Sequence, residues 1–594
     1  MTELLLSSKR RWTGAGPVAV RGRAFRGDDL LAGETLCEHF ADATTLDALA
    51  EALDALNGFF AVVVDGADGV LLGVDHARSI PLVYAPAADG GSGDEVADEN
   101  VTGLAGDDVA AVAKRLDGTY DPLAESEFLV SGTVLDDRTL LPDLRTVRPG
   151  TAVRLADGVV ETARYTDYRP RADVTPDGDA AVGTDVTGSD TAGADVVGAD
   201  AVDTGARTRL EAAVDAAFDR FAAVVGDRQV ALALSGGYDS RLVATELARR
   251  DVDLLTYSYG RPDAEDVRVA RDVAAALDVP WEFVEYSTER WRAWYCSPER
   301  ADYVDGAFTY DSIPNYGSLP AVSHLRRRDL LDDDAVCSSG QTVAGLSQHV
   351  PREIEGVEPT RSDLIDAILR EFARWEWENP AFDDTLRARI DASLSDGGID
   401  SAADALARFE RWKWGERHAK YFVADVRQYE FHGLGWWLPL RDRAVVDAWA
   451  TIPYADRREK RLFRSLVDDR FAAAAGLSGT EATALTVRTT APTLAGRAVD
   501  ALAERVVDSP VAPLLRGLYW RLQRRRSEYG DHPLGWYGIC PPELFAQLYS
   551  GREDVHALQA LDTVGRVSFA DGTVTDPPRD GVISLPYTGE TSSR

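Results

Sequence analysis

The chain has few cysteines, few lysines and no long apolar run. Its four cysteines, Cys37, Cys296, Cys337 and Cys540, lie far apart and form no Cys-x-x-Cys pair, so neither a zinc site nor a disulfide framework is expected. No apolar run approaches the ~18 residues of a membrane span. The basic residues at the amino terminus follow its apolar stretch, which is the reverse of a signal peptide. We therefore expect a soluble, cytoplasmic protein.

Positive charge is scarce. Asp and Glu total 99 against 64 Lys and Arg, which gives a formal charge of -35. Such a surface would repel nucleic acid and anionic lipid, so we expect neither as a partner. The low lysine content favours adaptation to concentrated salt, where a Debye length of ~3 Å at 1 M screens self-repulsion. The lysines are Lys9, Lys114, Lys413, Lys420 and Lys460.

The texture of the sequence changes along its 594 residues, which are too many for one ordinary core. Residues 18–168 alternate short β-branched runs with turns, apart from a helix candidate at 45–56, and predict a mainly β or α+β domain. Residues 172–206 have no aromatic residue and no hydrophobic period, so they predict a disordered linker.

Beyond the linker, apolar strands alternate with helical patterns, which predicts a parallel sheet with right-handed crossovers. The strands are expected at 230–234, 254–259 and 281–286, and the helices before and between them at 208–225, 241–250 and 264–277. Later helices are expected at 361–377, 402–431 and 490–526. The tail from about residue 564 is turn-rich and expected to be loose. We divide the chain into a β-rich domain (1–170), a linker (171–206), an α/β domain (207–475) and a helical extension with its tail (476–594).

The strand at 230–234 runs directly into Ser235-Gly236-Gly237-Tyr238-Asp239-Ser240 and then into a helix. Successive backbone N–H groups and the helix amino terminus make such a loop an anion site. Asp239 would repel a phosphate unless Mg²⁺ bridges them, which favours Mg²⁺–pyrophosphate. The alternative is a plain strand-to-helix turn with a serine or aspartate cap. The number of specified residues favours phosphate binding.

The loop resembles the pyrophosphate loop of N-type ATP pyrophosphatases, and residues from about 50 to 470 resemble glutamine-hydrolysing asparagine synthetase. The resemblance implies an α/β ATP-pyrophosphatase fold that binds ATP and Mg²⁺, with Asp239 as a metal ligand. It also implies small substrates, namely an acid such as aspartate and either ammonia or glutamine. Tyr259 is a candidate adenine contact or a packed strand residue. The nucleotide-binding positions implied are Leu234, Ser235, Gly236, Gly237, Asp239, Ser240, Tyr259, Ser339 and Gly340.

Two later stretches carry the same resemblance. Residues 427–442 match a family segment through Leu434, Pro439 and Asp442, although Gly435 and Trp437 replace a glutamate and an arginine. Residues 459–464 resemble the family's Glu-Lys-x-(apolar)₂-Arg motif. Lys460 in this motif could neutralise charge on the departing pyrophosphate and help to manage protons. The alternative is a solvated lysine at a helix end, which the scarcity of lysine disfavours.

The resemblance fails at two acidic positions. After the strand at 335–337, Gln341 replaces a family carboxylate, and Ala344 stands where a metal-binding aspartate is expected. An amide binds Mg²⁺ more weakly than a carboxylate. Either Asp263, Glu265 or Asp266 compensates, or the chemistry differs.

The amino-terminal region resembles the family's glutaminase domain, which has an α+β Ntn-hydrolase-like fold, through residues 56–61, 75–84 and 149–150. Asn57 and Gly58 are either a remnant of the glutamine site or a turn before a core strand. The family nucleophile is an amino-terminal cysteine activated by its own amino group. This chain has Met1-Thr2-Glu3 there and only the internal Cys37 nearby. Glutamine hydrolysis is therefore not expected, and free or partner-supplied ammonia would provide nitrogen.

Three functional hypotheses remain. The favoured one is an asparagine synthetase-like ligase that adenylates aspartate and then forms the amide with ammonia. The second keeps the adenylation but uses another acceptor, as in β-lactam-forming or other amidating relatives. The third is a nucleotide-binding regulatory protein without turnover. The sequence leaves open the acceptor, the nitrogen donor and whether the chain forms a homodimer.

Overall fold

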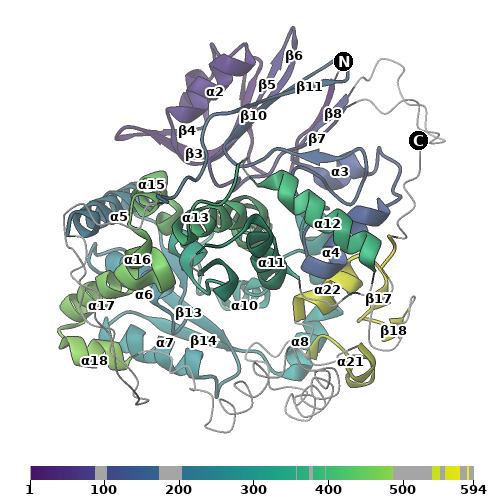
Figure 1. Ribbon diagram of the computed structural model, residues 1–594. Coiled ribbons are helices and arrows are strands. Elements are labelled where there is room, and N and C mark those ends of the chain that lie inside the picture. Colours follow the sequence, from purple (N-terminus) through teal and green to yellow (C-terminus); the bar gives the residue numbers. More distant parts are fainter. Residues whose placement is uncertain are drawn as a thin grey trace.

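The computed structural model describes residues 2–86, 103–172, 204–355, 358–373, 377, 379–394, 397–485, 538–548, 555–574 and 585–587. The predicted linker lies outside these residues except at its two ends, and the predicted helix at 490–526 lies outside them entirely. Figure 1 shows a β-rich amino-terminal part at the top and helices clustered beneath it.

The amino-terminal region, residues 2–172, contains two β-sheets. The first has the strand order β1 (Thr2–Leu5), β8 (Gly103–Gly106), β7 (Val83–Pro86) and β9 (Arg145–Thr146). The second has the order β11 (Val159–Arg164), β10 (Thr151–Ala156), β6 (Gly69–Val74), β5 (Asn57–Gly66), β3 (Val18–Arg26) and β2 (Thr13–Ala15), with β4 (Asp29–Ala32) paired to β3.

These two sheets pack face to face between helices. Side chains of β5 alternate between its two faces, as the twofold period of a strand requires. Phe60, Val62 and Val64 pack with α1 (Glu34–His39) and α2 (Leu46–Asp54), whereas Ala61 and Val63 contribute to the core shared with the other sheet. Helix α3 (Val109–Ala113) covers the far side of that sheet. The order of layers is therefore helix, sheet, sheet, helix.

The second region is built on a parallel sheet, as the alternation of strands and helices predicts. Its strand order is β14 (Trp281–Glu285), β13 (Leu254–Gly260), β12 (Val230–Ala233), β15 (Val336–Ser338) and β16 (Gly435–Trp436). The helices before and between these strands are α5 (Thr204–Val225), α6 (Tyr238–Ala248), α7 (Glu265–Ala276), α8 (Thr288–Tyr295), α9 (Pro298–Ala307) and α10 (Leu319–Arg327).

Strand β12 is the point where the order of the sheet reverses. The chain passes from β12 to β13 and β14 on one side, and later adds β15 and β16 on the other side. Val230 of β12 lies opposite Leu254 of β13 and Val336 of β15. In open α/β sheets, ligands bind outside the carboxyl ends of the strands at such a reversal. The loop after β12 and the segment after β15 meet at this place.

Two later helices differ from their prediction. Helix α11 (Arg361–Phe372) ends before residue 377, because Ala373 takes an extended conformation. The run at 402–431 is helical throughout but irregular. It begins as α13 (Ala402–Lys413), widens into the π-helix η3 (Trp414–Phe422), tightens into the 3₁₀ turn η4 (Val423–Val426) and ends as α14 (Arg427–Phe431).

The remaining helices pack around these elements. Part of the tail expected to be loose forms a hairpin of β17 (Val567–Ser568) and β18 (Thr573–Val574), because Val567 and Phe569 are buried in the main core. Among the described residues, no helix combines the length and apolar character needed to cross a bilayer. The other helices and turns are α4 (Pro122–Ser131), η1 (Val343–Ser347), η2 (Arg352–Glu355), α12 (Pro380–Ser393), η5 (Pro439–Arg441), α15 (Arg443–Ala450), α16 (Tyr454–Arg457), η6 (Arg458–Lys460), α17 (Arg461–Ala475), α18 (Gly479–Ala484), α21 (Pro542–Leu548) and α22 (Val555–Thr563).

Candidate active site

The loop after β12 folds back on its own hydroxyl groups. The backbone N–H of Ser235 donates to Ser240 Oγ at 3.0 Å, and the N–H of Gly237 donates to Ser235 Oγ at 3.3 Å. Leu234 is buried, and its carbonyl accepts from Ser258 Oγ at 2.7 Å. Gly237 is the N-cap of α6 and provides no side-chain cap. The alternative of a serine or aspartate cap is therefore wrong, and the α6 amino terminus keeps its partial positive charge at the loop.

Of the three candidate acids, Asp266 places its carboxylate on this loop. Its Oδ1 accepts from the N–H of Gly236 at 2.9 Å. Burial raises the pKa of Asp266, while the Gly236 N–H opposes that shift. Asp263 and Glu265 instead pair with Arg261 and Arg268. A carboxylate held by a loop amide indicates that the loop accepts anions.

Asp239 and Lys460 meet at the start of α6. Lys460 Nζ lies 2.8 Å from Asp239 Oδ2 and 3.1 Å from Oδ1. Lys460 is only 6 % exposed, so the solvated helix-end alternative does not hold. Burial raises the pKa of Asp239, and Lys460 acts in the opposite direction.

The backbone at Lys460 is strained. Glu459 and Lys460 have φ values of 51° and 59°, in the left-handed region that residues other than glycine rarely adopt. Each such residue costs on the order of 1–3 kcal/mol and persists where the surrounding structure imposes it, often at functional sites. Here the strained turn precedes α17 and directs Lys460 to the loop.

Gly340, after β15, touches the loop from the other side. A Cβ atom at this position would lie 2.5 Å from the backbone nitrogen of Ser240, so only glycine permits this approach. The neighbouring Ser339 is 7 % exposed, and its Oγ has no hydrogen-bond partner among the described residues. A buried hydroxyl without a partner costs free energy of folding and marks a position where a ligand could bind.

Gln341 extends this edge towards Asp425, a residue that the sequence analysis missed. Gln341 Nε2 donates to Asp425 Oδ2 at 3.4 Å, and Gln428 Nε2 donates to Oδ1. Burial raises the pKa of Asp425 to about 6, and the two amides only partly oppose this shift. A carboxylate therefore lies beside the position where Gln341 replaces one. The acidic residue in a predicted helix was the only signal, and no spacing linked it to Gln341.

Tyr259 lies at the end of β13, on the same edge. Its ring stacks on Tyr286 with centroids 5.2 Å apart, and burial raises the pKa of its hydroxyl well above the usual range. The carboxylates of Asp425 and Asp266 contribute to that shift. Tyr259 is thus packed, as one of its two interpretations requires, and it also lies near two site carboxylates.

Asn57 and Gly58 begin strand β5 and do not form a turn before it. Asn57 Nδ2 donates to Asp442 Oδ1 at 2.9 Å, and its Oδ1 accepts from the N–H of Arg443 at 3.0 Å. A Cβ on Gly58 would lie 2.4 Å from the carbonyl oxygen of Arg23. Both residues therefore hold the two regions and the sheet together.

Trp437, which replaces a family arginine, and Cys37, the cysteine nearest the amino terminus, also have structural positions. Trp437 is 2 % exposed and packs edge-on against Phe59 at 4.8 Å and Phe25 at 6.1 Å. Cys37 is buried, its Sγ donates to the carbonyl of Thr13, and burial raises the pKa of its thiol. A buried thiol with a raised pKa does not suit a nucleophile.

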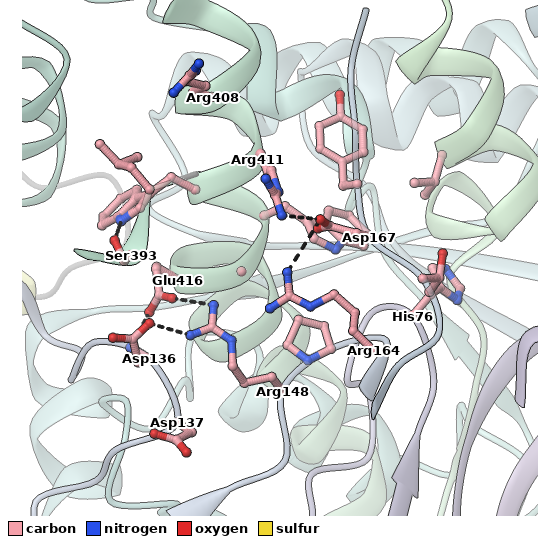
Figure 2. A pocket seen from close by; sticks show the side chains of 18 of the residues that line it. His76, Asp136, Asp137, Arg148, Arg164, Asp167, Ser393, Arg408, Arg411 and Glu416 are labelled. Carbon is pink, nitrogen blue, oxygen red and sulfur yellow. Dashed lines mark hydrogen bonds and ion pairs between the residues drawn. The ribbon is translucent and has the colours of Figure 1, made fainter. Parts of the chain in front are cut away.

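A separate pocket of about 400 Å³ lies between the amino-terminal region and helices α12 and α13. Its charged groups pair with each other, as Figure 2 shows: Arg148 contacts Asp136 and Glu416, and Asp167 contacts Arg164 and Arg411. It contains none of the predicted nucleotide-binding residues. We therefore place the candidate site at the sheet edge.

A Mg²⁺ ion fits the sheet edge only together with phosphate. Among the described residues, no three His, Cys, Asp or Glu side chains converge as a metal site. Mg²⁺ commonly takes one or two carboxylates along with phosphate and water oxygens. Asp239 and Asp266, both at the loop, suit that arrangement.

Residues 207–328 match the family model described as asparagine synthase. The matched segment contains β12, the loop, β13 and β14. Ser339, Gly340, Asp425 and Lys460 lie outside it. No curated protein sequence matches the chain.

Proposed function

We propose that this chain, whose residues 207–328 match the asparagine synthase model, uses ATP to adenylate a carboxylic acid and then converts it to an amide with ammonia. Asparagine synthases are ATP-dependent amide-forming ligases, so the family supports the reaction class. The observation that carries the proposal is the loop at 235–240. It joins the reversal point of the sheet to an uncapped helix, with Lys460 beside it.

The proposed reaction has two steps. An oxygen of the acid attacks the α-phosphorus of ATP, the bond to the β-phosphate oxygen breaks, and pyrophosphate leaves. Ammonia then attacks the acyl carbon, the bond to AMP breaks, the nitrogen releases one proton to solvent, and the amide is released. Activation is needed because a carboxylate is a poor electrophile, whereas a mixed phosphoric anhydride has a good leaving group.

The loop residues would act mainly on the departing pyrophosphate. The N–H groups at 235–237 bind Ser240 Oγ, Asp266 Oδ1 and Ser235 Oγ in this structure. They would exchange these acceptors for pyrophosphate oxygens, the α6 terminus would add its partial positive charge, and Lys460 would neutralise the charge that develops. Asp239 and Asp266 would hold Mg²⁺ on the phosphates, and the bound ion would offset their charge. The hydroxyl of Ser339, which has no hydrogen-bond partner among the described residues, would donate to the bound nucleotide.

We further propose that residues 2–172 form an Ntn-hydrolase-like domain that no longer hydrolyses glutamine. Its helix–sheet–sheet–helix layers support the fold, while the buried Cys37 and the structural role of Asn57 oppose a glutaminase site. Ammonia would then be the nitrogen source, and aspartate the first acid to test.

A second candidate function changes the acceptor. The family's acidic position is occupied by Gln341, and Asp425 approaches from a different element. This altered edge favours an acceptor other than aspartate, as in a β-lactam-forming or other amidating enzyme. A regulatory protein without turnover is the third candidate, and Lys460 at the loop argues against it.

Release of pyrophosphate and AMP separates the three candidates. The pure protein is incubated in concentrated salt with ATP, Mg²⁺, ammonia and one acid at a time. Release that depends on aspartate supports the first function, and release that depends on another acid supports the second. ATP binding without release of pyrophosphate for any acid would support the third function and overturn the ligase. Replacing ammonia by glutamine tests the amino-terminal region.

The variant Lys460→Ala tests the site itself. We expect acid-dependent pyrophosphate release to fall by about 100-fold or more, because a positioned cation stabilises the developing charge. Lys114→Ala removes an exposed lysine at the end of α3 and should leave the rate unchanged. If Lys460→Ala kept the wild-type rate, the assignment of this loop would be wrong.

A further inference from the structure

The Asp425 carboxylate accepts hydrogen bonds from two glutamine side chains that come from different parts of the chain. Gln341 follows β15 and Gln428 lies in α14, and each donates its Nε2 hydrogen to one carboxylate oxygen. A carboxylate can only accept, so each amide must turn its nitrogen to Asp425. Gln341 Oε1 and Gln428 Oε1 are consequently left without a hydrogen-bond donor among the described residues.

This cluster contains acceptors but no cation. Within the described part of the chain, no Lys, Arg or His nitrogen forms an ion pair with Asp425, and only burial and the two amides shift its pKa. By contrast, Glu430 pairs with Arg21, and Glu416 pairs with Lys420. Gln428 is fully buried, and buried acceptors without donors cost free energy of folding. A ligand that is cationic and rich in N–H donors would satisfy all three groups.

The cluster adjoins the nucleotide loop. Gln341 directly follows Gly340, whose Cα approaches the backbone of Ser240 closely enough to exclude any Cβ atom. The charges of Asp425 and of the loop's Asp266 both raise the pKa of Tyr259, at the end of β13. The three acceptors therefore lie at the same carboxyl edge as the loop.

We propose that Asp425, Gln341 and Gln428 form a binding site for an ammonium group. Asp425 supplies the negative charge, and the two amide oxygens accept N–H hydrogens. The group is either free ammonium, the source of the nucleophile, or the amino group of the acid substrate. Its role in amide formation depends on the proposed function. If the ligand is free ammonium, Asp425 would take the proton that ammonium must lose before its nitrogen can attack the acyl carbon.

Binding can be tested without turnover. The melting temperature is measured in sodium chloride at constant ionic strength while ammonium chloride replaces part of the salt, with tetramethylammonium chloride as a cation lacking N–H donors. We expect a saturable rise with ammonium alone. In Asp425→Asn, the half-saturating concentration should rise about tenfold or more. The control Asp263→Asn removes an exposed carboxylate and should respond like the wild type.

A second variant guards against an effect of Asp425→Asn on packing. Gln341→Leu keeps the carboxylate and removes one amide oxygen, so it should also weaken ammonium binding. The proposal is overturned if the wild type responds equally to both cations, or if Asp425→Asn keeps the wild-type midpoint. Neither result depends on ATP or an acid, so pyrophosphate release still tests the proposed function separately.

Competition identifies the source of the ammonium group. Aspartate and succinate differ by the amino group, so both are added to the ammonium titration. If aspartate but not succinate raises the half-saturating ammonium concentration, the site takes the amino group of the acid. If neither competes, free ammonium is the ligand. Both results support an ammonium site and assign it to a different molecule.

Discussion

Carboxylates have different partners in two parts of this molecule. At the junction between residues 2–172 and the rest of the chain, Arg21 pairs with Glu430, and Arg148 and Lys420 pair with Glu416. At the carboxyl edge of the parallel sheet, Asp425 accepts from two side-chain amides, and Asp266 accepts from the Gly236 N–H.

The pKa directions follow this difference. Burial is the largest single influence and raises the pKa of each carboxyl. For Glu430 and Glu416 the surrounding cations and hydrogen bonds, led by Arg21 and Lys420, together outweigh it and lower the pKa. At the sheet edge, burial dominates and raises the pKa of Asp239, Asp266 and Asp425. The first arrangement stabilises the fold, whereas the second leaves charge and hydrogen-bonding capacity for a ligand.

The junction also contains an exception. Glu127 of α4 pairs with Arg389 of α12, yet burial raises its pKa to about 7. A single arginine does not always compensate for burial. The number of cations and hydrogen bonds around a carboxylate therefore separates the two classes better than its location.

The largest effect should come from breaking an ion pair at the junction. Arg78 Nη2 lies 2.7 Å from Asp311 Oδ2, and both side chains are almost fully buried. In Arg78→Met, the Asp311 carboxylate loses its cation, so we expect the free energy of unfolding to fall by about 3–5 kcal/mol. Denaturant titration in concentrated salt measures it.

The matched control is Arg169→Met, whose side chain is 77 % exposed and pairs with Asp167 at 3.4 Å. Its free energy of unfolding should stay within about 0.5 kcal/mol of the wild type. Equal losses in the two variants would show that the junction pairs do not differ from surface pairs.

The sequence predicts the sheet edge and the junction unequally well. The strands of the parallel sheet, the loop at 235–240 and Lys460 follow from local apolar runs and short motifs, because each depends on neighbouring residues. Asp425 depends on Gln341, which is 84 residues away. The nine-residue π-helix η3 also changes the angular phase of the helix before Asp425. A pattern based on 3.6 residues per turn therefore misplaces the residues that follow.

The junction was difficult to predict for a related reason. Asn57 and Asp442 are 385 residues apart, and neither the asparagine nor the aspartate shows in the sequence that it will be buried against the other. The family resemblance suggested a glutamine site, whereas the structure shows Asn57 in contact with Asp442 and Arg443.

The second prediction concerns Asp425 at the sheet edge, where removing the charge should raise the free energy of unfolding and not lower it. The pKa of Asp425 is about 6 in the folded protein against an ordinary value of 3.8. Its contribution to stability is fully present below pH ~4 and is lost as the pH rises through about 6. Asn resembles the protonated form, so Asp425→Asn should be more stable than the wild type at pH 7.5, by on the order of 3 kcal/mol.

Melting curves between pH 4 and 8 provide the measurement. The advantage of Asp425→Asn should shrink as the pH falls and vanish near pH 4. Asp311→Asn provides the contrast, because it removes the anion that pairs with Arg78 and should destabilise the protein. If both variants were destabilised at pH 7.5, Asp425 would be a structural carboxylate like Asp311.

The smallest effect is expected at Asn57, where the two interpretations of the amino-terminal region differ most. Its side chain makes two hydrogen bonds across the junction, to the Asp442 carboxylate and from the N–H of Arg443. Asp442 is also held by Arg220 through two contacts of 2.7 Å, so it keeps its cation in Asn57→Ala. We therefore expect a loss of only about 1–2 kcal/mol in the free energy of unfolding. A residue of a glutamine site would instead change the rate supported by glutamine relative to that supported by ammonia. That ratio should be identical in Asn57→Ala and the wild type, and a selective loss of the glutamine-supported rate would reassign Asn57 from the junction to a working glutaminase.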